Sequence, residues 1–93
     1  MDRVELEVLL VRNAITLALE ILADEDSPVV YATPEMLAPL TMKSKDSVRT
    51  VLGIMQRRGE IERFVGRGGR RKMTVLMDRP GAAEYVNERK VCR

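Results

Sequence analysis

Two strand-like runs separated by a segment of glycine and basic residues constrain the fold of this chain most. Residues 61–65 and 73–77 are rich in β-branched, aromatic and aliphatic side chains, which favour strands. Between them, residues 66–72 contain three glycines, which can supply the positive φ angles of a hairpin turn, and four Arg or Lys residues. We therefore expect an antiparallel β-hairpin with a basic tip.

The first forty residues show helical patterns interrupted by one short strand. Apolar residues recur with alternating spacings of four and three over residues 4–23, which predicts a long first helix. Residues 29–32 have the composition of a strand. Thr33 can cap the following helix, whose first position suits Pro34, and Pro39 limits that helix to a short one.

A third helix is predicted over residues 45–58. Ser44 is a suitable N-cap, and Gly59 can adopt the left-handed conformation that often ends a helix. Residues 82–90 are expected to form a short closing helix. The chain is therefore predicted to be α+β and mostly helical. The apolar face of the third helix consists of Val48, Val51, Leu52 and Met55.

Length and composition limit the possible classes of function. Ninety-three residues allow a single domain, 1–93, whose core we expect over residues 29–77. The chain has no His and a single Cys, Cys92, which excludes a His-based triad, a zinc site and a disulfide within one chain. The glycines of 66–72 precede a strand and no Gly-Lys-Ser/Thr is present, so nucleotide hydrolysis is not expected. We expect no enzyme activity, no cofactor and no metal.

Charge is distributed unevenly along the chain. Residues 1–41 contain eight acidic and two basic residues, whereas residues 42–93 contain fourteen basic and six acidic residues. This asymmetry is typical of a protein that presents one face to a polyanion. Solvated charges clustered by chance would give the same counts, so charge alone leaves both interpretations open.

The predicted order of helix, short strand, helix, turn, helix and β-hairpin resembles that of the winged helix-turn-helix superfamily. Residues 33–37 resemble the start of the family's second helix, and Ser47-Val48 resembles the pair that opens its recognition helix. Thr41 departs from the family, whose turn often has Gly and is one residue shorter in its tightest form. The resemblance covers residues 33–77 and implies binding to double-stranded DNA. Further matches are Leu52, Met55, Gly59, Ile61 and Arg63.

The resemblance assigns roles to the third helix and the hairpin. Helix 45–58 would enter the major groove, where Arg49 can pair with guanine and Thr50 can contact a thymine methyl group or a phosphate. The hairpin tip 66–72 would be the wing, which contacts the DNA backbone or the minor groove. The expected DNA-binding residues are Lys43, Ser44, Lys45, Ser47, Arg49, Thr50, Arg57, Arg67, Arg70, Arg71 and Lys72.

The first helix has two adjoining apolar rows, although a surface helix of a small domain needs only one. We expect homodimerisation through the first row, with helix 82–90 as a second dimerisation element. The alternative is a central helix buried on both sides by its own chain. Cys92 is expected to be a free thiol, with an intersubunit disulfide as the alternative. The first row is Val4, Val8, Val11, Ile15, Ala18 and Leu22, and the second is Leu10, Ala14, Leu17 and Ile21.

Together these features predict a homodimeric transcriptional regulator that binds specific double-stranded DNA sequences. The alternative is a winged helix that binds protein within a transcription or replication assembly. RNA binding is less favoured, because Phe64 and Tyr31 are expected in the sheet and not free to stack on bases. No small-molecule effector is evident. The apolar region 4–23 is interrupted by polar residues and the chain starts with acidic ones, so we expect no membrane association and a cytoplasmic, nucleoid-associated protein.

Overall fold

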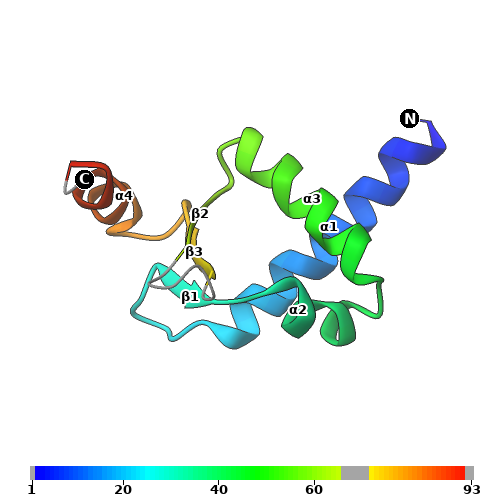
Figure 1. The fold of residues 1–93 in the computed structure, drawn as a ribbon, viewed down its shortest axis with the longest axis horizontal. Coiled ribbons are helices and arrows are strands. Elements are labelled where there is room, and N and C mark those ends of the chain that lie inside the picture. The colour runs from blue at the N-terminus through cyan, green and yellow to red at the C-terminus, as the bar shows by residue number, and fades with distance from the viewer. Residues whose placement is uncertain (1, 66–71, 92–93) are drawn as a thin grey trace.

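The computed structural model describes residues 2–65 and 72–91. This part of the chain is α+β and mostly helical, and its element ends lie within one residue of those predicted from the sequence. The order of the elements is α1 (Arg3–Leu22), β1 (Val29–Tyr31), α2 (Pro34–Thr41), α3 (Lys45–Arg57), β2 (Ile61–Val65), β3 (Lys72–Leu76) and α4 (Ala82–Val91) (Figure 1).

Side-chain caps explain where the first three helices begin. The Asp2 side chain accepts a hydrogen bond from the backbone N–H of Glu5 at 2.8 Å, and α1 starts at Arg3, directly after Asp2. Thr33 Oγ1 caps α2 in the same way at 3.2 Å, with Pro34 at the first helical position as predicted. The short α2 contains Pro39 and ends at Thr41, and the next residue, Met42, caps it with a left-handed φ of 57°. Gly59, with φ of 76°, follows the end of α3 as predicted.

The three strands form one antiparallel sheet in the order β1-β3-β2. In Figure 1 the sheet lies between α4 on one side and the group of α1, α2 and α3 on the other. Because side chains alternate along a strand, each face of the sheet has its own apolar cluster. Val30 and Ile61 join the main core with α1, α2 and α3, whereas Val75 packs with Ala82 and Val86 of α4.

The main core corrects the predicted dimer interface. Val11, Ile15 and Ala18 are buried within their own chain, and Leu22 packs against the same core. Three members of the first row are therefore covered by α2, α3 and the sheet, and the core includes α1 as well as the predicted segment 29–77. Of the remaining members, Val4 is exposed and Val8 is half-buried. In the second row, Leu10, Leu17 and Ile21 are exposed.

Two ionic links hold α1 against the rest of the fold. Arg12 pairs with Glu60, which lies between α3 and β2. Arg79, in the turn after β3, donates to Glu20 Oε2 at 2.6 Å and to the backbone carbonyls of Asp24 and Ser27 at 2.8 and 2.9 Å. These links leave Arg12 and Arg79 engaged within the chain, so neither is a candidate for binding a ligand.

Candidate nucleic-acid interface

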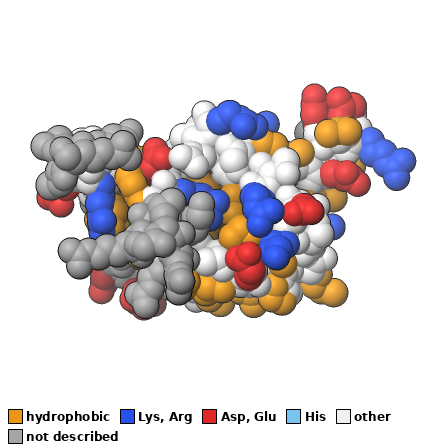
Figure 2. Space-filling model, viewed as in Figure 1, with side chains coloured by type: hydrophobic (Ala, Val, Ile, Leu, Met, Phe, Trp, Pro, Cys, Tyr) orange, Lys and Arg blue, Asp and Glu red, His pale blue; other side chains and the backbone are white. Residues whose placement is uncertain are grey.

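The two faces of α3 differ in burial. Its apolar face is buried as predicted, and it orients the helix against α1 and α2. The predicted DNA-binding residues of α3 and the preceding turn are all exposed: Lys43, Ser44, Lys45, Ser47, Arg49, Thr50 and Arg57. Figure 2 shows Lys and Arg side chains over α2 and α3 on this side of the molecule, with acidic side chains among them.

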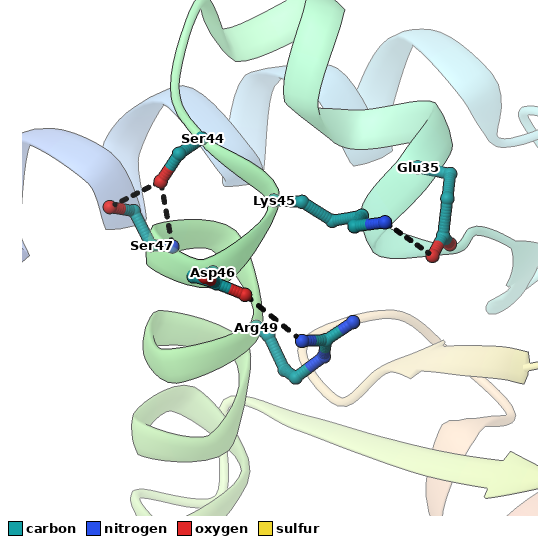
Figure 3. Close-up of polar contacts among 6 residues, drawn as sticks. All are labelled: Glu35, Ser44, Lys45, Asp46, Ser47 and Arg49. Carbon is teal, nitrogen blue, oxygen red and sulfur yellow. Dashed lines mark hydrogen bonds and ion pairs between the residues drawn. The ribbon is translucent and has the colours of Figure 1, made fainter.

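The N-terminus of α3 is ordered by two serines (Figure 3). Ser44 Oγ accepts a hydrogen bond from the backbone N–H of Ser47 at 3.1 Å and donates to Ser47 Oγ at 3.0 Å. The cap leaves the first turn exposed, where N–H groups without helical partners favour an anion such as a phosphate. Lys43, Lys45 and Arg49 lie within two turns of this end, whereas Arg57 lies at the opposite end of α3, about 12 Å beyond Arg49 along the helix axis.

Two carboxylates partly neutralise the cations of this surface (Figure 3). Lys45 Nζ lies 3.7 Å from Glu35 Oε1, and Arg49 Nη1 lies 3.1 Å from Asp46 Oδ1. A hydrogen bond with its own backbone lowers the pKa of Glu35, and the nearby Lys45 lowers it further. Both pairs are solvent-exposed, and exposed ion pairs contribute little to stability. Lys45 and Arg49 can therefore exchange these carboxylates for other partners at little cost.

The predicted hairpin is present as the antiparallel pair β2 and β3. Its register runs from Ile61 opposite Leu76 to Val65 opposite Lys72. The basic segment, residues 66–71, therefore connects the end of β2 to the start of β3 in the sequence. Lys72 is the first residue of β3. The other predicted wing residues, Arg67, Arg70 and Arg71, lie outside the described residues.

Arg63 on β2 was not among the predicted DNA-binding residues, yet its environment is unusual. Its side chain is half-buried on the sheet face shared with Ile61, and its Nε and Nη2 atoms are buried without a hydrogen-bond partner. Directly opposite on β3, Thr74 Oγ1 is also buried without a partner. Burial lowers the pKa of the Arg63 guanidinium, and no carboxylate of the described residues pairs with it. Arg63 is thus a desolvated cation with unused donors.

The signal for Arg63 is visible in the sequence only in part. The alternation of Ile61 and Arg63 places both side chains on one face of a strand, and Ile61 marks that face as the buried one. Whether a carboxylate meets a half-buried Arg depends on residues distant in sequence. The absence of such a partner therefore could not be predicted.

Within residues 2–65 and 72–91, no three Asp, Glu or Cys side chains are grouped so that they could hold a metal ion. Among the same residues, no helix is both long and apolar enough to cross a membrane. No protein-family model matches the chain, and no curated protein matches its sequence. The assignment of function therefore rests on the fold and on the residues of α3 and the hairpin.

Proposed function

We propose that this protein is a winged helix-turn-helix protein that binds specific sequences of double-stranded DNA as a homodimeric transcriptional regulator. One observation carries the proposal: α3 is held by a buried apolar face, its opposite face is exposed and carries Lys45 and Arg49, and a hairpin with a basic connection follows it. In a winged helix-turn-helix, the corresponding helix enters the major groove and the hairpin contacts the backbone or the minor groove.

The exposed start of α3 has the chemistry for reading base pairs. Arg49 can make a bidentate contact to guanine once it leaves Asp46, and Thr50 can contact a thymine methyl group or a phosphate. Ser44 and Ser47 lie where the N-terminus of the helix favours a phosphate. Asp46 can accept a hydrogen bond from the amino group of a cytosine base. Where a phosphate lies beside it instead, its negative charge repels the DNA.

The hairpin supplies the contacts that are independent of sequence. Arg67, Arg70, Arg71 and Lys72 repel one another in the free protein, and a polyanion relieves this repulsion. Arg63 lies in the middle of β2 of the same hairpin, and its buried donors would have to swing out of the sheet face shared with Ile61 to reach a DNA phosphate. In a dimer, two-fold symmetry would require a nearly palindromic site with half-sites about 34 Å apart or a multiple of that distance.

Salt dependence is the direct test of this proposal. Fluorescence anisotropy with random duplex DNA is expected to show log affinity falling linearly with log salt concentration, because binding releases counterions from phosphates. Replacing both Arg70 and Arg71 by Ala is expected to weaken binding to all sequences about equally and to reduce the salt slope by about 1–2. The matched control removes two positive charges from α4, on the other side of the sheet, through Arg89→Ala and Lys90→Ala. If the variant with Arg70→Ala and Arg71→Ala kept the wild-type DNA affinity and salt dependence, the wing would not contact DNA.

Arg63→Met is expected to stabilise the protein and to weaken its binding to DNA. Met is similar in length but needs no counter-charge, so the free energy of unfolding should rise by about 1 kcal/mol. Affinity for duplex DNA should fall by about tenfold, because a charge-assisted hydrogen bond contributes on the order of 1.5 kcal/mol. Thermal unfolding and anisotropy measure the two effects on one sample. A stabilised variant with unchanged DNA affinity would exclude Arg63 from the interface.

Protein binding is the second candidate function. Leu40, in the last turn of α2, and Met42, just after that helix, are large apolar side chains that remain exposed. A protein partner would cover such side chains, whereas DNA phosphates would not. Failure to bind duplex DNA even at low salt, with an RNA duplex as the comparison, would favour this second function over the first.

A further inference from the structure

The outer face of α1 carries a line of exposed apolar side chains. Leu10, Leu17 and Ile21 are 55%, 66% and 76% exposed, and Leu6 is exposed one turn before Leu10. Spacings of four, seven and four place these residues along one line of a helix. We call them the outer stripe of α1. The outer stripe points away from the core, because the buried residues Val11, Ile15 and Ala18 occupy the other side of the same helix.

We infer that α1 pairs in antiparallel orientation with α1 of a second copy of this chain through the outer stripe. The inference deepens the proposed function, because a two-fold dimer would present two copies of α3 to a palindromic site. It also replaces the first apolar row, whose members Val11, Ile15 and Ala18 are buried in the core, with a different set of residues as the dimer interface.

The spacing of the outer stripe makes it complementary to itself. Its four residues are arranged symmetrically about the midpoint between Asn13 and Ala14. An antiparallel pair centred there places Leu10 opposite Leu17 of the partner subunit, and Leu6 opposite Ile21 of the partner subunit. Every large apolar residue of the stripe therefore meets another one, and the pattern is that of a narrow coiled-coil seam.

Charge favours the same orientation and register. Arg3 lies at one end of the outer stripe and Asp24 lies just beyond the other, and each is exposed. Within the described residues, neither side chain forms an ion pair. The antiparallel register that pairs Leu10 with Leu17 also brings Arg3, the first residue of α1, close to the end of the partner's α1, which Asp24 of the partner subunit follows by two residues, and it does so at both ends of the seam. A parallel pair would instead place Arg3 beside Arg3 and Asp24 beside Asp24, which repel.

The centre of the seam is small and polar. Asn13 is exposed, and its Oδ1 accepts a hydrogen bond from Arg12 Nη1 at 2.9 Å. A polar residue at one central position of a helical seam favours a single register over shifted ones. In the register centred between Asn13 and Ala14, Asn13 lies opposite Ala14 of the partner subunit and keeps the centre of the seam polar.

The first test is the mass of the protein in solution. Sedimentation equilibrium over a range of concentration is expected to give a reversible dimer for the wild-type chain. Leu17→Lys is expected to give a monomer with an unchanged far-UV circular dichroism spectrum, because Leu17 makes no contribution to the buried core. Leu40→Lys, a matched exposed position on α2, is expected to keep the dimer. A wild-type chain that stays monomeric, or a Leu17→Lys variant that still dimerises, would overturn the inference.

The second test is a charge exchange that reports on orientation. Arg3→Asp is expected to weaken the dimer, and adding Asp24→Arg to the same chain is expected to restore it, because the two charges then exchange places across the seam. Failure of the double exchange to restore dimerisation would overturn the antiparallel register. DNA affinity measured on the same samples separates the two proposals: a dimer without DNA binding contradicts the proposed DNA binding and leaves the pairing intact, whereas a DNA-binding monomer contradicts the pairing, and with it the homodimeric state, and leaves DNA binding intact.

Discussion

Ile15→Ala is expected to lower the free energy of unfolding by about 2–5 kcal/mol, and Ile15→Asp is expected to abolish folding. Ile15 has no exposed surface and lies where α1 packs against α2 and α3, so Ala would leave a cavity and Asp would bury an unpaired charge. Domains of this size have total stabilities of roughly 5–10 kcal/mol, so the Ala variant should retain only part of it. Urea unfolding followed by circular dichroism measures the loss.

Leu40→Ala provides the comparison for this prediction. Leu40 is a large apolar residue on α2 whose side chain is half exposed, and its removal is expected to change stability by about 0.5 kcal/mol or less. An Ile15→Ala protein that unfolds at the same urea concentration as the wild type would contradict the position of α1 in the core. Such a result would instead agree with the expectation from sequence that the first apolar row lies on the surface.

Arg49→Ala is expected to weaken binding to the target site by about 1–3 kcal/mol through the loss of one base-pair contact, while affinity for random DNA changes only slightly. Arg49 is exposed on the first turns of α3, and its ion pair with Asp46 is weak enough to exchange for a guanine. The measurement requires selection of a preferred duplex, followed by anisotropy with that duplex and with each single-base-pair variant. The wild type should discriminate at the contacted position, and the variant should not.

Two further variants determine the role of Arg49. Asp46→Asn keeps the guanidinium but removes its intramolecular partner, so binding to all sequences should strengthen modestly. Arg57→Ala removes one positive charge from the opposite end of α3 and should weaken binding without changing base preference. A uniform loss of affinity in Arg49→Ala, equal to that in Arg57→Ala, would identify Arg49 as a phosphate contact instead of a base contact.

The ends of the helices were predictable because local chemistry determines them. Ser44 accepts from the N–H three residues later whatever surrounds it, and Gly59 adopts a positive φ without a steric penalty. The same holds for Thr33 and Pro34 at the start of α2. The buried face of α3 was predictable for a related reason, since its apolar residues recur at the helical period on one side only.

The candidate site was predictable to a lesser degree. Exposure of Arg49 and Lys45 follows from the polar face of α3, but their ion pairs with Asp46 and Glu35 depend on side-chain geometry and on the angle between α2 and α3. The unused donors of Arg63 depend on which side chains the sheet, α2 and α3 bring near it. Those contacts join residues distant in sequence, so no local pattern reports them.

The sequence by itself determined the elements of this protein, because caps, glycines and apolar periodicity act within a few residues of where they occur. It also determined that the basic residues gather on the third helix and the hairpin. Only the tertiary structure decided which apolar row of α1 enters the core and which remains as the outer stripe. Both rows have helical spacing, and the choice between them is made by the contacts of Val11, Ile15 and Ala18 with elements that follow later in the chain.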